Sequence, residues 1–214
     1  MMKKGIIFDM DGTVWDSSEN VARSWTVKLH EAGYTDREIT RGDIQSVMGK
    51  TMDVIADILF PFTEKGPERD TLRYSCQNYE VEYLRENGGI LYDGILDTWT
   101  ELKRRGYHIY IVSNCQSGYI ESFLEYYHIP CGTPDDVVED IECYGNNLLR
   151  KSENIRLVVE RNGLDEAWYV GDTQGDLDSA TDAGIPFVYA SYGFGTVNRS
   201  VQTITKFSDL LNLF

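Results

Sequence analysis

The sequence predicts an α/β protein with a doubly wound parallel sheet and a smaller, all-helical domain. Short apolar runs rich in β-branched and aromatic residues alternate with helical patterns over most of the 214 residues. Such alternation is typical of parallel strands that are buried between helices. Residues 15–88 break the alternation, because they contain helical patterns and no convincing strand. We therefore expect a sheet domain formed by residues 1–14 and 89–214, and a helical domain formed by residues 15–88.

The strands of the sheet are predicted from apolar runs that are continuous rather than alternating. These runs span residues 6–8, 109–112, 137–141, 168–170 and 185–189. Continuous apolar runs indicate strands that are buried on both faces, as in a parallel sheet covered by helices.

Helical patterns separate these strands. The clearest one spans residues 94–105, where apolar residues recur on one face and Gly106 ends the helix. Two further helices are predicted from about residue 152 to Gly163 and from about residue 175 to residue 183. Each of them precedes another strand.

The helical domain is predicted from four segments, which span about residues 18–32, 42–48, 51–59 and 68–86. It begins just after the pair Asp9 and Asp11 and ends at Gly88-Gly89. Both connections to the sheet domain should therefore lie beside this acidic pair. A domain in that position can act as a lid over the site.

Composition limits the functions that this chain can have. The formal net charge of −15 argues against binding to nucleic acids or to anionic membranes, since both require a cationic surface. The four cysteines show no CxxC spacing and the three histidines are isolated, so we expect no zinc site. Residues 1–4 run directly into the first strand, which predicts no signal peptide, no membrane span and a cytoplasmic location.

Two carboxylates two residues apart follow the first predicted strand. Asp9 and Asp11 stand where the run Ile6-Ile7-Phe8 ends, and Gly12 allows the backbone to turn sharply behind them. The carboxyl ends of parallel strands are where open α/β sheets bind ligands. Paired carboxylates at this place indicate a hard cation, nucleophilic catalysis, or both.

Other polar residues follow later strands in the same way. Ser113-Asn114 ends the second predicted strand, Arg150-Lys151 precedes a helix, and Asp172 and Asp176 follow the fourth strand. This set suits phosphoryl transfer through an aspartyl phosphate, in which one carboxylate attacks phosphorus and a second transfers protons. Hydroxyl, amide and ammonium groups would hold the phosphate oxygens, and Mg²⁺ would bridge carboxylates and phosphate.

The order of these motifs resembles the haloacid dehalogenase superfamily, and specifically its capped phosphatases, of which phosphoglycolate phosphatase is an example. The matching motifs are Asp9-Met10-Asp11-Gly12-Thr13, the Ser113-Asn114 pair, a lysine, and the Gly171-Asp172 to Asp176 segment. The resemblance covers nearly the whole chain. It implies a Rossmann-like core with a helical cap, Mg²⁺ as cofactor, and a small phosphorylated metabolite as substrate.

The resemblance also implies a role for each residue. Asp9 would be the nucleophile and Asp11 the general acid and base, whereas the superfamily's dehalogenases lack an acid at the second position. Ser113, Asn114 and Lys151 would bind phosphate. The residues of the Mg²⁺ site would be Asp9, Asp11 through its backbone carbonyl, Asp172 and Asp176.

Two lysines are candidate ligands of the substrate. The phosphate-binding lysine of these phosphatases is commonly followed by proline, but here Lys151 is followed by Ser152, so Arg150 is an alternative ligand. We prefer Lys151, because Ser152 could cap the following helix and place Lys151 at its start. Lys50 is the candidate for substrate selectivity, since a cap loop in this family reaches toward the nucleophile; its alternative is a solvated surface lysine.

Two other functions compete with a phosphatase. A sugar-phosphate mutase of the same superfamily would use the same residues and return the phosphate to the substrate. A phospho-accepting regulatory protein or a phosphate-binding scaffold would group similar residues without turnover. The sequence identifies neither the substrate nor the oligomeric state.

Overall fold

The computed structural model describes residues 2–214 and contains a six-stranded sheet in which every neighbouring pair of strands is parallel. The spatial order is β5 (Asp140–Cys143), β4 (Tyr107–Ser113), β1 (Lys4–Phe8), β6 (Glu166–Gly171), β7 (Phe187–Ala190) and β8 (Gln202–Ile204). Strands β4 and β5 lie on one side of β1, and strands β6 to β8 lie on the other side. The end of β1 is therefore the point at which the strand order reverses, where α/β sheets bind ligands.

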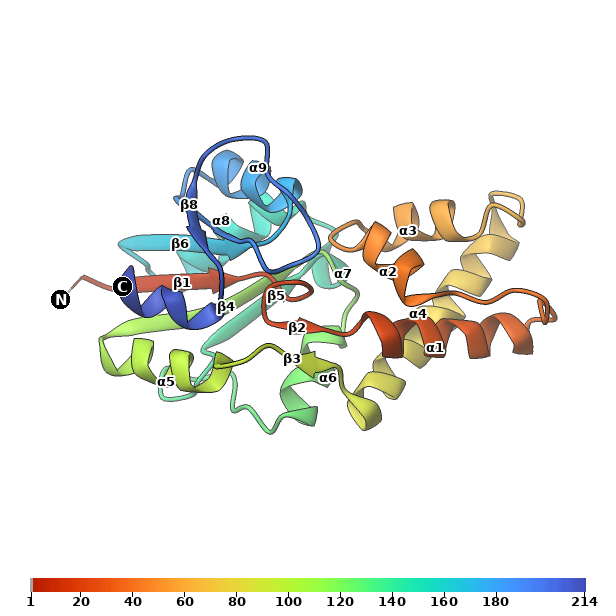
Figure 1. The fold of residues 1–214 in the computed structure, drawn as a ribbon, viewed down its shortest axis with the longest axis horizontal. Coiled ribbons are helices and arrows are strands. Elements are labelled where there is room, and N and C mark those ends of the chain that lie inside the picture. The colour runs from red at the N-terminus through yellow and green to blue at the C-terminus, as the bar shows by residue number, and fades with distance from the viewer. Residues whose placement is uncertain (1) are drawn as a thin grey trace.

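Helices cover both faces of this sheet (Figure 1). Ile6 and Phe8 point into an apolar cluster with α5 (Ile95–Arg104) and the 3₁₀-helix η1 (Phe207–Asn212). Ile7 points into a second cluster with α8 (Lys151–Arg161) and α9 (Gln174–Ala183). The alternation of side chains along β1 thus buries both faces of the strand, and the predicted doubly wound α/β fold is confirmed.

Residues 18–87 fold into four helices beyond the carboxyl end of the sheet (Figure 1). They are α1 (Ser18–Glu31), α2 (Arg41–Val47), α3 (Met52–Leu59) and α4 (Pro67–Asn87). We propose that residues 15–88 form the cap domain and that residues 1–14 and 89–214 form the core domain.

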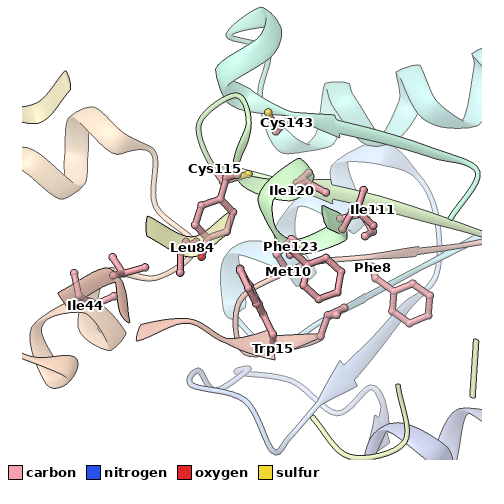
Figure 2. Packing of buried hydrophobic residues seen from close by; sticks show 14 of the residues in the cluster. Phe8, Met10, Trp15, Ile44, Leu84, Ile111, Cys115, Ile120, Phe123 and Cys143 are labelled. Atoms are coloured by element: carbon pink, nitrogen blue, oxygen red, sulfur yellow. The ribbon is translucent and has the colours of Figure 1, made fainter. Parts of the chain in front are cut away.

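One apolar cluster continues from the core into the cap. It includes Phe8 and Trp15 near the sheet and Leu84 and Ile44 among the cap helices (Figure 2). Trp15 is fully buried against Phe123 of α6 (Tyr119–Tyr126), with ring centroids 5.0 Å apart. Trp15 therefore packs in the core beneath the site instead of lining the pocket.

Several sequence expectations are wrong in detail. Residues 15–88 do contain a strand, because β2 (Trp15–Asp16) pairs antiparallel with β3 (Ile90–Leu91). Two residues are too few to show an alternating pattern. The strand expected at residues 137–141 begins only at Asp140; Val138 is fully buried in the preceding loop, so its apolar character reflects burial and not a strand.

Four other elements were not expected at all: α6, α7 (Tyr144–Asn147), β8 and η1. Among residues 2–214, no helix combines the length and the apolar character that crossing a membrane requires.

Candidate active site

The candidate site begins where β1 ends. The Asp9 N–H still donates to the carbonyl of Val170 on β6 at 2.9 Å, so Asp9 is held as an extension of the sheet. The chain then turns at Gly12, which has a φ of +82°. A β-carbon at Gly12 would lie 2.2 Å from Asp172 Oδ2, so a side chain at this position would displace the Asp172 carboxylate.

Three buried carboxylates meet beside this turn. Asp9, Asp172 and Asp176 each offer an oxygen within 4.8 Å of the others. Asp172 Oδ2 accepts hydrogen bonds from the backbone N–H groups of Phe194 and Gly195, at 2.7 and 3.3 Å. Asp176 completes a capping box at the start of α9 and accepts from the N–H and the hydroxyl of the N-cap residue Thr173. The sequence prediction that these acids lie together is consistent with this arrangement.

A single buried ammonium group faces these carboxylates. Lys151 Nζ lies 2.9 Å from Asp9 Oδ1 and 2.6 Å from Asp176 Oδ1. Burial lowers the pKa of Lys151, but the carboxylates of Asp176 and Asp9 outweigh it and hold this pKa well above its usual value. Lys151 is therefore charged at neutral pH.

One ammonium does not balance three carboxylates. Burial, and then the neighbouring charge of Asp176, raise the pKa of Asp9 to about 7 although Lys151 opposes the shift. The same two causes raise the pKa of Asp172 to about 8. The three carboxylates together with Lys151 thus have too little positive charge for neutrality. Carboxylate oxygens are also the ligands that Mg²⁺ prefers. The residues present fit a divalent cation.

Asp11 lies in a different environment from Asp9. Its Oδ1 accepts hydrogen bonds from Ser17 Oγ at 2.8 Å and from Tyr119 Oη at 2.7 Å. Burial raises the pKa of Asp11 to about 6, and the hydrogen bonds from Tyr119 and Ser17 limit the rise. The side chain of Asp11 is not part of the carboxylate group around Lys151. Its expected contribution to a metal site, through the backbone carbonyl, stays a prediction.

Ser113 and Asn114 stand at the end of β4. Ser113 is buried, and Asn114 Nδ2 donates to the carbonyl of Gly49 in the cap at 2.8 Å. This bond connects the core to the loop that carries Lys50. Lys50 is exposed, and it lines a pocket together with Asp11, Ser113 and Asn114.

The geometry separates Lys151 from its neighbour Arg150. The Arg150 side chain is exposed, and its backbone N–H donates to Glu153 Oε2 at 2.9 Å. Arg150 is the N-cap residue of α8, so the expectation that Ser152 caps this helix is wrong. Ser152 instead lies inside the first turn, and Lys151 is the first helical residue.

The pocket lies between the core and the cap and contains about 440 Å³ of empty space, including the part open to solvent. The core contributes polar residues, among them Asp11, Ser113 and Tyr119. The cap contributes mainly apolar residues of α1, α2 and α3, together with Glu80 of α4. Sequence reasoning missed Ser17, Tyr119 and Glu80, since nothing in the chain marks which residue in a helix or at its start faces the site.

Comparison with known proteins gives consistent results. A family model described as haloacid dehalogenase-like hydrolase matches residues 6–190. Phosphoglycolate phosphatase of Shigella dysenteriae serotype 1 is 25% identical, over 89% of this chain and 82% of that protein. A haloacid dehalogenase-like protein from Bacteroides fragilis superposes with a TM-score of 0.80 and 27% identity, covering 97% of this chain and 99% of the other.

A predicted phosphoglycolate phosphatase from Haemophilus somnus has the same TM-score of 0.80 at 20% identity, covering 100% of this chain and 98% of the other. At this level of identity the similarity shows the fold.

Proposed function

The chain belongs to the haloacid dehalogenase-like hydrolase family, and we propose that it is a Mg²⁺-dependent phosphatase that hydrolyses a small phosphomonoester through an aspartyl phosphate. The observation that carries the proposal is the different environment of two neighbouring acids. Asp9 contacts the ammonium group of Lys151, whereas within residues 2–214 the side chain of Asp11 accepts its hydrogen bonds from the hydroxyl groups of Ser17 and Tyr119. Different environments assign different roles to paired carboxyl groups.

Asp9 is the proposed nucleophile. One of its carboxylate oxygens attacks phosphorus, the bond between phosphorus and the leaving oxygen breaks, and an aspartyl phosphate forms. Lys151 contacts Asp9 and stabilises its ionised form before the attack, and it is proposed to bind the phosphate group. Ser113 and Asn114 donate hydrogen bonds to the phosphate oxygens, on which negative charge must be stabilised in the transition state.

Asp11 is the proposed general acid and base. Its raised pKa, about 6, keeps a proton available near neutral pH for the leaving oxygen. Once the leaving group has departed, the Asp11 carboxylate takes a proton from water. The water oxygen then attacks phosphorus, and the bond between phosphorus and Asp9 breaks to release inorganic phosphate.

Asp9, Asp172 and Asp176 would hold the Mg²⁺ ion, together with the backbone carbonyl of Asp11. When bound, the ion would supply positive charge to the phosphate group and to the carboxylates around Lys151. The exposed Lys50 is proposed to contact the substrate at the mouth of the pocket. We propose that the substrate is a small phosphorylated metabolite and that the protein acts in the cytoplasm, without binding nucleic acid or membranes.

Phosphate release tests this function directly. Wild-type protein is assayed with p-nitrophenyl phosphate and a panel of metabolite phosphates, with Mg²⁺ and with excess EDTA. Release that requires Mg²⁺ supports the proposal, whereas full activity in EDTA contradicts the metal role. Phosphoglycolate belongs in the panel, because curated relatives are named for its hydrolysis.

Asp9→Asn should fold normally and lose turnover, because an amide is nearly isosteric with the carboxylate but is a very poor nucleophile. Asp178→Asn is the matched control, since Asp178 is exposed on α9 and the charge change is the same. If Asp9→Asn keeps activity within about tenfold of the wild type, in protein shown by mass spectrometry to be free of deamidation, Asp9 is not the nucleophile.

A further inference from the structure

The pocket beside Asp11 has one buried carboxyl group that the proposed mechanism does not use. Glu80 lies on α4 and is 3% exposed. Its Oε2 accepts a hydrogen bond from Trp25 Nε1 on α1 at 2.5 Å. Both residues line the pocket that Asp11 and Ser113 also line. The carboxyl group is thus fixed in orientation by the cap and faces the space next to the proposed general acid.

The carboxyl group of Glu80 accepts fewer hydrogen bonds than it could. A carboxylate can accept about four hydrogen bonds, but within residues 2–214 the one well-formed hydrogen bond to Glu80 comes from the Trp25 indole. Burial raises the pKa of Glu80 to about 7, and hydrogen bonding from Trp25 and then from the nearby Gln116 side chain opposes this rise. A buried carboxyl group in this state gains from any further donor that enters the pocket.

A second polar group of the same pocket lies beside Glu80. Gln116 follows β4 in the core, and its buried Nε2 is close enough to lower the pKa of Glu80 but makes no well-formed hydrogen bond among residues 2–214. Buried polar atoms without partners are rare in proteins, and each calls for an explanation. The pocket therefore offers an acceptor, Glu80, and a donor, Gln116, both poised for a ligand that has polar atoms of its own.

We propose that Glu80 and Gln116 bind the leaving group of the substrate, and that they select a phosphomonoester whose short leaving group carries a hydroxyl or an ammonium group. This inference rests on the proposed function. A hydroxyl group would donate to Glu80 and accept from Gln116, whereas an ammonium group would form an ion pair with Glu80. The apolar residues of α1 and α2 in the same pocket would cover the carbon atoms of a short leaving group.

The same arrangement disfavours a second anionic group inside the pocket. Its interior faces the acidic side chains of Glu80 and Asp11, and like charges without solvent between them repel strongly. The one cationic residue that lines the described pocket is Lys50, which is exposed. A second anionic group of the substrate could therefore be placed only at the mouth, beside Lys50.

The test compares four short esters and two variants. The esters are glycerol 1-phosphate, phosphoethanolamine, n-propyl phosphate and 2-phosphoglycolate, with p-nitrophenyl phosphate as a reference that needs no contact with Glu80. Glu80→Gln removes the charge and keeps an acceptor, and Glu80→Leu removes both. Glu82→Gln is the matched control, because Glu82 is exposed on the same helix. Thermal unfolding of each variant establishes that it is folded.

In the wild type, kcat/KM for glycerol 1-phosphate or phosphoethanolamine should exceed that for n-propyl phosphate by about tenfold or more, as expected for one hydrogen bond to a charged group. Glu80→Leu should abolish the preference. Glu80→Gln should abolish it for phosphoethanolamine and retain it in part for glycerol 1-phosphate, which distinguishes the two kinds of donor. Glu82→Gln should change neither.

Two results overturn the inference even if no variant folds. One is a wild-type kcat/KM for n-propyl phosphate equal to those of both donor-bearing esters, and the other is 2-phosphoglycolate as the best substrate of the four. Either result leaves the phosphatase function intact, since p-nitrophenyl phosphate is still hydrolysed. A failure to release phosphate from every ester, the reference included, refutes the proposed function itself.

Discussion

Replacing Glu80 by glutamine should change how the stability of the protein depends on pH. Burial raises the pKa of this carboxyl group from 4.5 to about 7 in the folded protein. Each pKa unit corresponds to about 1.4 kcal/mol. Ionising Glu80 in the folded state therefore costs about 3 kcal/mol of unfolding free energy relative to its exposed form in the unfolded chain. Glutamine at this position keeps the shape and cannot ionise.

The direction in which stability changes with pH follows from the number of protons that each state binds. Between about pH 4.5 and pH 7, folded Glu80 holds its proton while the unfolded chain has lost it, so stability falls as the pH rises. Above pH 7 both states are ionised and the cost is constant. The unfolding free energy of the wild type, minus that of Glu80→Gln, should thus decrease by about 3 kcal/mol between pH 4 and pH 8.

The groups around Glu80 add little pH dependence of their own to the difference in unfolding free energy between the wild type and Glu80→Gln. Cys76 and Tyr119 stay neutral over the whole range, because burial raises the pKa of Cys76 to about 12 and that of Tyr119 well above its usual value. Asp11 has a smaller influence and titrates in both proteins. Trp25 carries no charge. The carboxylates around Lys151 are common to the two proteins and largely cancel in the comparison.

Urea unfolding at a series of pH values, followed by tryptophan fluorescence and circular dichroism, measures this difference. Glu82→Gln provides the control, since Glu82 is exposed on the same helix and its difference from the wild type should be nearly constant with pH. If the difference for Glu80→Gln also stays constant to within about 1 kcal/mol, Glu80 has an ordinary pKa and is not desolvated in the way we describe.

Three further predictions concern the site. Asp11→Asn should lower kcat for hydrolysis of an alkyl phosphate by about a hundredfold or more, and for p-nitrophenyl phosphate much less, because nitrophenolate leaves without a proton. Equal losses of kcat on both esters would contradict the role of Asp11 as leaving-group acid. Lys151→Ala should lower kcat/KM by about a hundredfold or more, and Arg150→Ala should lower it little; the reverse order would assign phosphate binding to Arg150. Lys50→Ala should raise KM by about tenfold for an ester with a second anionic group and scarcely at all for p-nitrophenyl phosphate; unchanged KM values for both would make Lys50 a solvated surface residue.

The carboxyl end of the sheet was the most predictable part of the molecule. Parallel strands bring their carboxyl ends to one edge whatever the details of packing, so residues that follow different strands must meet there. This is why the positions of Asp9 and Asp172 in the sequence were enough to anticipate that they lie together, as the structure shows. Their chemical roles remain predictions. Strand β5 was placed too early because burial and strand formation leave the same apolar signal at Val138.

The cap side of the site was not predictable in the same way. A residue of a helix faces the pocket only if the helix packs with that face toward it, and this depends on contacts between segments far apart in the chain. Tyr119, which donates to Asp11, is the first residue of α6, and α6 packs against α4; Glu80 lies on α4, which also packs against α1. Neither residue belongs to a motif, so no pattern in the sequence distinguishes them from surface residues of the same type.

The burial of Glu80 is itself informative about the cap. A glutamate on a helix is expected to face solvent, and placing its carboxyl group in an apolar pocket conflicts with the preference of the residue type. Helix α4 also buries Arg69, but each nitrogen of its guanidinium group donates a hydrogen bond, to Thr63 or to Asp57 Oδ1. Among the described residues, the one well-formed hydrogen bond to the Glu80 carboxyl group comes from the indole of Trp25, and the Gln116 amide lies nearby. Because folding gains nothing from an unsatisfied carboxyl group that leucine would not supply at lower cost, a bound ligand gives the more direct physical reason for a glutamate at this position.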